Sequence, residues 1–166
     1  MRRSVLLVFT ILLGFFATAA LARQVNVPSG NPVLGVDIPN GWKTSATNRG
    51  IEVRSPDEEI FFWIEVYLPA QYDAVVKEHE KYFKGQGVAI TGEPKIATSN
   101  EDGVKIQATD FPATWKGDKT ILRYLAIDPN LPAKNQVLLS FWASPEGEKK
   151  HDAAFQKILG SLGPPK

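Results

Sequence analysis

Cysteine is absent from the whole 166-residue sequence. The fold therefore contains no disulfide and must be held together by its core alone. The same absence excludes a thiol nucleophile, a thiolate metal site and a haem attachment motif. It also excludes a lipoprotein anchor, because such an anchor is attached through a cysteine.

Histidine is scarce, and recognisable catalytic motifs are missing. The two histidines, His79 and His151, have no second histidine or carboxylate at the third or fourth following position, where one helix face would complete a metal site. The sequence also lacks the nucleophile elbow, the Walker A motif, the G-x-G-x-x-G dinucleotide motif and the EF-hand loop. We expect each histidine at the edge of the core with its polar edge in water. We predict no catalytic, metal-binding or cofactor-binding residue, and no cofactor.

Long apolar runs are also absent, with one exception at the N-terminus. After Arg2 and Arg3, residues 5–22 carry no charge and end in an A-x-A pattern at Ala22. A positive start, an apolar middle and a small-residue exit are typical of a secretory signal peptide. We expect residues 1–22 to be removed after Ala22, which makes the protein periplasmic or secreted and leaves no transmembrane segment. An uncleaved anchor is the competing interpretation, because a spanning helix needs roughly 20 apolar residues.

The chain also has no excess of positive or negative charge. Without residues 1–22, the chain keeps 17 basic side chains against 18 acidic ones, since Arg2 and Arg3 are lost. A nearly neutral chain without blocks of like charge has no electrostatic reason to bind nucleic acid. We expect an extended lead-in over residues 23–33 and a single domain over residues 34–163, long enough to bury a sizeable core.

Period-two alternation between turn residues predicts strands over most of the domain. Two segments, residues 70–84 and 146–161, instead repeat apolar residues at helical spacing. Ser144 and Pro145 predict the start of the second helix, as its N-cap and first helical residue. The expected strands are residues 34–38, 42–46, 51–54, 60–68, 88–91, 95–98, 104–115, 120–127 and 136–143.

The segment 60–68 is apolar on both of its faces, which is typical of a central strand that is covered on both sides. Strands that follow one another through tight turns pair in antiparallel fashion. We therefore predict the α+β class, with a mostly antiparallel sheet of about six to eight strands and two main helices packed on it.

Trp115 is a candidate contact residue. It ends the alternating segment 104–115 beside the predicted hairpin turn at residues 116–118, where we do not expect the core to reach. The polar side chains of Lys105, Gln107 and Thr109 lie on its face of the strand. We therefore predict a protein-contact site made of Phe111, Trp115 and Lys116. The rival explanation is that the loop at residues 128–134 folds over Trp115 and buries it.

Residues 34–42, with the sequence LGVDIPNGW, resemble the opening of domains in the PsbP-like fold group. In that group a strand ends in proline, a turn residue and glycine, and tryptophan follows. The pattern F-x-x-I-L-x-x-L at residues 155–162 resembles the C-terminal helix of the group, and the order of elements is alike over roughly residues 34–162. Gly41 and Trp42 match a structural corner, so the resemblance carries over no functional residue.

The resemblance implies a class of function. The group includes extrinsic subunits of photosystem II, a Ran-binding nucleotide-release factor and exported bacterial domains of unknown role, and most members bind proteins and are not enzymes. It implies a non-enzymatic adaptor or assembly domain whose partner is another extracytoplasmic protein. Two alternatives stay open: a binder of a small ligand in an apolar cavity, and a small exported hydrolase whose carboxylates are assembled by the fold.

Overall fold

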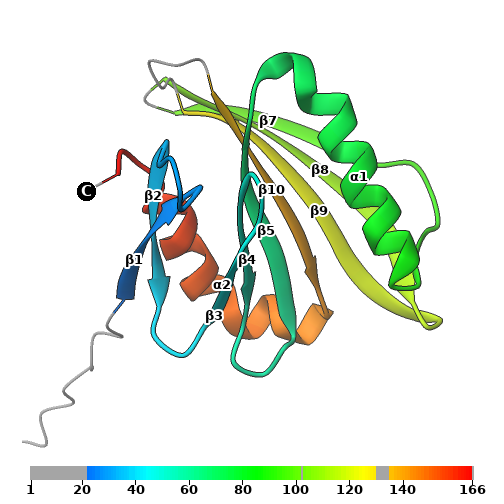
Figure 1. Cartoon of the computed structure of the whole chain (residues 1–166). Coiled ribbons are helices and arrows are strands. Elements are labelled where there is room, and N and C mark those ends of the chain that lie inside the picture. Colours follow the sequence, from blue (N-terminus) through cyan, green and yellow to red (C-terminus); the bar gives the residue numbers. More distant parts are fainter. Residues whose placement is uncertain (1–21, 102, 130–134, 166) are drawn as a thin grey trace, which may run out of the picture.

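The computed structural model describes residues 22–101, 103–129 and 135–165. The expected signal segment therefore lies outside the described residues except for Ala22, and so do most residues of the loop at 128–134. The described chain forms an eight-stranded sheet, a separate two-stranded hairpin and two α-helices (Figure 1). None of these helices is long and apolar enough to cross a membrane.

All strand pairs of the large sheet are antiparallel, in the order β3-β4-β5-β10-β9-β8-β6, and β7 pairs with β8 beside β6. The predicted α+β class is confirmed. The strands are β1 (Ala22–Val27), β2 (Leu34–Pro39), β3 (Lys43–Ala46), β4 (Gly50–Arg54), β5 (Ile60–Tyr67), β6 (Val88–Ile90), β7 (Lys95–Glu101), β8 (Val104–Trp115), β9 (Asp118–Asp128) and β10 (Gln136–Ala143). The helices are the short 3₁₀ helix η1 (Pro69–Gln71), α1 (Tyr72–Gly85) and α2 (Pro145–Gly160).

Strand β5 lies between β4 and β10 and is covered on both faces, as its sequence predicts. Phe62 and its alternate neighbours pack with Phe155 and Ile158 of α2. Phe61 and Trp63 pack on the other face with Phe83 of α1. The sheet is therefore sandwiched, with α1 on one face and α2 with the β1–β2 hairpin on the other (Figure 1).

Both α-helices begin where the sequence predicts, within two residues. Ser144 caps α2, because its hydroxyl accepts a hydrogen bond of 2.8 Å from the backbone N–H of Gly147, and Pro145 is the first helical residue. Three residues of α1, spaced by four positions, face the sheet and are buried: Val75, His79 and Phe83.

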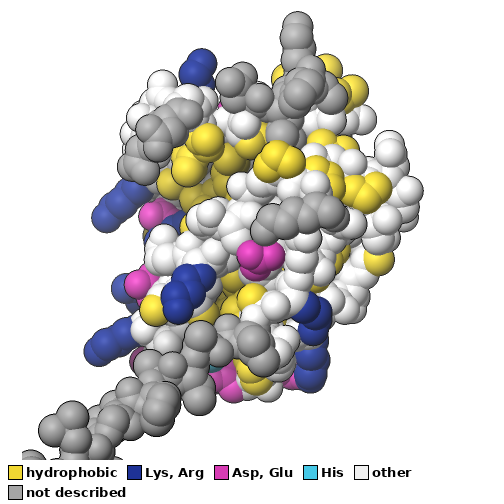
Figure 2. All heavy atoms as spheres, turned by 90° about the vertical axis from the view of Figure 1, so that its left-hand side faces the viewer, with side chains coloured by type: hydrophobic (Ala, Val, Ile, Leu, Met, Phe, Trp, Pro, Cys, Tyr) yellow, Lys and Arg dark blue, Asp and Glu magenta, His cyan; other side chains and the backbone are white. Residues whose placement is uncertain are grey.

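The structure adds pairing that the sequence patterns do not predict. Residues 22–27, at the expected lead-in, form β1 and pair along the whole of β2. Strand β7 continues to Glu101 rather than ending at Thr98. After α2, Gly163 pairs with Gly35 through two backbone hydrogen bonds of 2.8 and 3.1 Å, so the chain end closes on β2. Figure 2 shows the face of the molecule that carries the β1–β2 hairpin, where charged side chains of both signs are scattered.

Candidate functional site

Trp115 and Lys116 lie at the tip of the hairpin between β8 and β9. Lys116 and Gly117 both have positive φ, 54° and 94°, and Trp115 pairs directly with Asp118. Two such residues in succession are typical of the tightest hairpin turns, which keep the right-handed twist of the strands. The turn holds Trp115 at the end of the sheet.

Trp115 is fixed in place although 37% of it is exposed. Its indole Nε1 donates a hydrogen bond of 3.0 Å to the carbonyl oxygen of Gln86, at the end of α1. Its ring meets the ring of Trp142 edge to face, with 5.5 Å between centroids. The ammonium of Lys116 lies 4.3 Å from its ring centroid, a cation–π contact. A rigid, half-exposed indole is a typical anchor for a protein contact.

Phe111 has a different position from that of its two predicted partners. It is half-buried, and its ring packs edge to face on Tyr124 at 5.2 Å, within the cluster beneath α1. Ala113, between Phe111 and Trp115 on the same face, is buried. The face of β8 is therefore open to water at Lys105 and Gln107, covered in the middle and open again at Trp115.

Trp115 borders a groove with a volume of about 1130 Å³, here called the aromatic groove. Its floor is a chain of three rings, since Phe61 lies 6.3 Å from Trp142, which contacts Trp115. The indole of Trp142 is itself fixed by a hydrogen bond of 2.9 Å from Nε1 to Thr120. The walls come from β4, β5, the end of α1, the β8–β9 hairpin and the start of α2.

The rim of the aromatic groove is predominantly acidic. It carries four carboxylates, from Glu58, Glu59, Asp118 and Glu146, against the cations of Arg54 and Lys119. Arg54 is already engaged, because its guanidinium lies over the ring of Phe61 at 4.5 Å and hydrogen-bonds Glu52 at 2.8 Å. Glu58 is engaged as well, in an ion pair of 2.9 Å with Lys43. Asp118 and Glu146 make no ion pair with any residue that the structure describes.

A buried polar network, which the sequence patterns do not reveal, holds α1 to the sheet. His79 is 2% exposed; its Nδ1 lies 2.7 Å from Ser140 Oγ, and its Nε2 lies 3.1 Å from Glu65 Oε2. Its expected position, with a polar edge in water, is therefore wrong. The reason is that β5 and β10 each place one polar side chain opposite His79, and buried polar groups need partners.

Glu65 is the charged centre of this network and is 4% exposed. It also accepts hydrogen bonds from Thr47 at 2.7 Å and from the Nε of Arg49 at 2.9 Å. Burial opposes its ionisation, but the hydrogen bonds from His79 and Thr47 and the charge of Arg49 outweigh burial. They hold the pKa of the Glu65 carboxyl below its ordinary value. Arg49 extends the network to Glu78 at 3.0 Å.

The order serine, histidine, carboxylate resembles that of a hydrolase triad, but the position of the serine does not. A hollow of about 600 Å³ is lined by Arg49, Glu65 and His79, whereas Ser140 is fully buried and does not line it. The Ser140 hydroxyl is therefore out of reach of a substrate.

The second histidine, His151, is half-buried, and its Nε2 lies 2.9 Å from the Asp57 carboxylate. Among the described residues, no group of three or more His, Asp and Glu side chains is placed to hold a metal ion.

The chain is similar in structure to several solved proteins, among them the following three. The cyanobacterial PsbP of Synechocystis sp. PCC 6803 matches 90% of this chain and 96% of its own, with a TM-score of 0.60 and 8% identity. The Ran-binding protein Mog1p of Saccharomyces cerevisiae matches 85% of this chain and 94% of its own, with a TM-score of 0.51 and 9% identity. The third is PA94 of Pseudomonas aeruginosa, described as a protein of unknown function and putative regulator, with coverages of 80% and 92%, a TM-score of 0.40 and 16% identity.

The likeness to cyanobacterial PsbP shows that the chain has the PsbP-like fold, as residues 34–42 and 155–162 predict. At 8% identity it shows the fold alone. No protein-family model matches the sequence, and no curated protein matches it.

Proposed function

We propose that this PsbP-like domain is a non-enzymatic protein-binding domain and that the aromatic groove is its contact surface. The observation that carries the proposal is the state of Trp115. A hydrogen bond and two ring or cation contacts fix this side chain, yet 37% of it stays exposed at the edge of an open groove of about 1130 Å³. Binding to a rigid aromatic anchor costs little side-chain entropy, and such anchors dominate the energy of protein interfaces.

The groove also defines the chemistry of the partner. Its aromatic floor favours an apolar side chain. Two of its rim carboxylates, Asp118 and Glu146, make no ion pair with a described residue and favour lysine or arginine beside that side chain. The partner segment is therefore expected to carry an apolar anchor flanked by basic residues. The fold neighbour Mog1p, named as a Ran-binding protein, supports a protein-binding role by analogy.

The proposed place of action is outside the cytoplasm, after cleavage behind Ala22. Arg23 would then be the first residue. Its guanidinium donates hydrogen bonds to the Trp42 carbonyl at 3.2 Å and to the Thr44 hydroxyl at 2.8 Å, so it belongs to the folded domain. Cleavage behind Ala22 would therefore leave β1 intact from Arg23 onward, which is compatible with the assignment.

The test is a pull-down from extracytoplasmic extract with the wild type, Trp115→Ala and Ile96→Ala. Ile96 is a matched control, because it is 63% exposed and lies on β7, outside the aromatic groove. We expect a specific partner to be lost with Trp115→Ala and kept with Ile96→Ala. A charge-reversed variant, Glu146→Lys, should weaken capture, and less so at high salt. Equal recovery with the wild type and Trp115→Ala would refute the proposal.

A further inference from the structure

Three tyrosines between α1 and the sheet have hydroxyls without hydrogen-bond partners among the described residues: Tyr67, Tyr72 and Tyr124. Burial raises the pKa of Tyr67 to about 12 and also raises the pKa of Tyr72 and Tyr124, so all three remain protonated donors at neutral pH. Of the three hydroxyls, only that of Tyr124 is fully buried; those of Tyr67 and Tyr72 face open space, where a ligand or water can be their partner.

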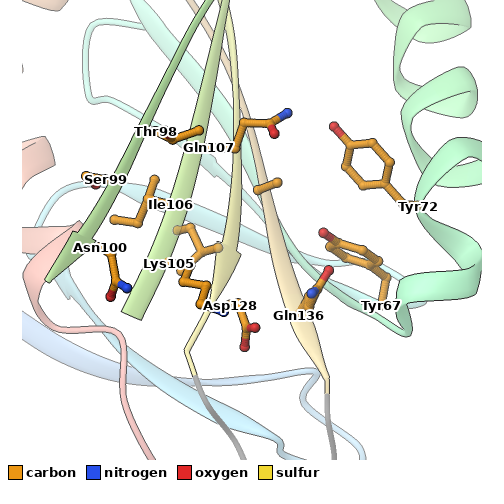
Figure 3. Close-up of a pocket in the computed structure, with 12 residues that line it drawn as sticks. Tyr67, Tyr72, Thr98, Ser99, Asn100, Lys105, Ile106, Gln107, Asp128 and Gln136 are labelled. Carbon is orange, nitrogen blue, oxygen red and sulfur yellow. The ribbon is translucent and has the colours of Figure 1, made fainter. Parts of the chain in front are cut away.

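Two of the three, Tyr67 and Tyr72, line a hollow of about 650 Å³, here called the tyrosine hollow. It lies where α1 begins, and its other walls are β7, β8, β9 and β10. Figure 3 shows both hydroxyls directed into the space between α1 and the strands, with the amide end of Gln107 on the opposite side. The volume is within the usual range for small-molecule sites, about 300–1,000 Å³.

The lining is rich in hydrogen-bonding groups but has little net charge. The side-chain amides of Gln107 and Gln136 each offer donors and an acceptor. Lys105 and Asp128 occupy directly paired positions on β8 and β9, so one positive and one negative charge lie side by side. The uncharged groups that the lining offers to a ligand are thus two phenol donors and two amides.

We propose that the tyrosine hollow binds a neutral saccharide. A sugar offers hydroxyls and ring oxygens that accept from the phenols and amides, and its apolar C–H faces pack on the tyrosine rings, which lie 5.7 Å apart. A charged ligand would have no net counter-charge in the lining. The hollow differs from the closed apolar cavity that the sequence leaves open as an alternative. It is also separate from the aromatic groove, with which it shares no residue.

The test is a titration of the mature protein with maltose and with diacetylchitobiose, followed by ¹⁵N NMR and calorimetry. We expect at least one of the two disaccharides to shift the amide signals of Tyr72, Gln107 and Gln136 saturably. Tyr67→Phe and Tyr72→Phe should each weaken that binding about 5-fold, the effect of one lost hydrogen bond of about 1 kcal/mol.

Tyr124→Phe is the control, because its hydroxyl also lacks a hydrogen-bond partner but is buried and does not line the hollow. It should bind the disaccharide as the wild type does. All three variants lose a hydroxyl without a protein partner, so their thermal midpoints should not fall. The inference is overturned if neither disaccharide shifts these signals at tens of millimolar, or if Tyr67→Phe and Tyr72→Phe bind with wild-type affinity. Protein capture through Trp115 is measured separately, so either proposal can fail alone.

Discussion

The side chain of His79 illustrates how a single residue can join three elements. It lies on α1 and contacts Glu65 of β5 and Ser140 of β10, and its ring packs on Trp63 with 4.5 Å between centroids. Each of these groups is buried, so the loss of a partner is costly. We infer that the network determines where α1 sits on the sheet.

Replacing His79 by leucine should lower the free energy of unfolding by about 2–4 kcal/mol, because Ser140 and one oxygen of Glu65 lose a partner inside the core. Chemical denaturation measures this change. Glu78→Gln is the control: it removes an ion pair with Arg49 from an exposed side chain, which should cost less than about 1 kcal/mol. Equal costs for the two variants would mean that the buried network adds no specific stability.

The same network predicts how stability depends on pH. The pKa of Glu65 is lower in the folded state than its ordinary value of 4.5. Such a group contributes stability that is fully present above the unfolded pKa and is lost as the pH falls through the folded pKa. Hydrogen bonds from Lys150, Ser55 and His151 likewise hold the pKa of the Asp57 carboxyl below its usual range, so it acts in the same direction.

We therefore expect the free energy of unfolding to decrease as the pH is lowered below about 4.5, measured by urea denaturation at several pH values. Glu65→Gln should be less stable at neutral pH and should lose less of its remaining stability on acidification. A variant that keeps the full wild-type slope would show that Glu65 does not carry this dependence.

At the scale of elements, α2 is held tightly where it begins. A methyl group added at Gly147 would lie 2.6 Å from Glu59 Cβ and 2.8 Å from the Glu59 carbonyl oxygen, which is backbone and cannot turn away. The Ser144 backbone N–H also donates to that carbonyl oxygen at 3.2 Å. The first turn of α2 thus packs directly on the turn between β4 and β5, beside the aromatic groove.

Gly147→Ala should therefore destabilise the domain by about 1–3 kcal/mol, the usual cost of overpacking. Gly160→Ala, in the last turn of the same helix, meets no atom within 4 Å. It should be neutral or stabilising by up to about 1 kcal/mol, because alanine favours the helix. Thermal unfolding of the two variants tests the contrast, which fails if Gly147→Ala is tolerated as well as Gly160→Ala.

The elements themselves could largely be predicted from the sequence. Strands β8 and β10 coincide with the predicted ranges because their alternation is long and is bounded by clear turns. Strand β1 could not be predicted from its sequence, ARQVNV, because the polar residues Arg23, Gln24 and Asn26 are poor strand formers. Likewise β7 extends through Ser99, Asn100 and Glu101, where pairing with β8 outweighs the turn preference of those residues.

The sites are less predictable because they join segments that are distant in the chain. Trp115 could be identified from the hairpin turn beside it. Its neighbours Phe61 and Trp142 come from other strands, and no sequence pattern places them beside it. The acidic rim and the tyrosine hollow likewise arise only when the sheet twists and α1 lies across it.

At the scale of the whole molecule, the mature chain is expected to start at Arg23. Expression in a secreting host, followed by mass spectrometry of the exported protein, should give a product without residues 1–22, and N-terminal sequencing should read Arg23-Gln24-Val25. An intracellular control without export should retain Met1. A membrane-bound product that still contains residues 1–22 would instead support the uncleaved anchor.

Helix α1 begins at the tyrosine hollow with Tyr72 and ends beside the aromatic groove, where Gln86 accepts the hydrogen bond from Trp115. His79 fastens this helix near its midpoint. Val75 and Phe83, which are also buried, hold the helix on either side of His79, and about 20 Å of helix separates the two ends. Saccharide and protein partner should consequently bind at the same time, each with an affinity that is independent of the other, so the domain can bring the two together without regulating either.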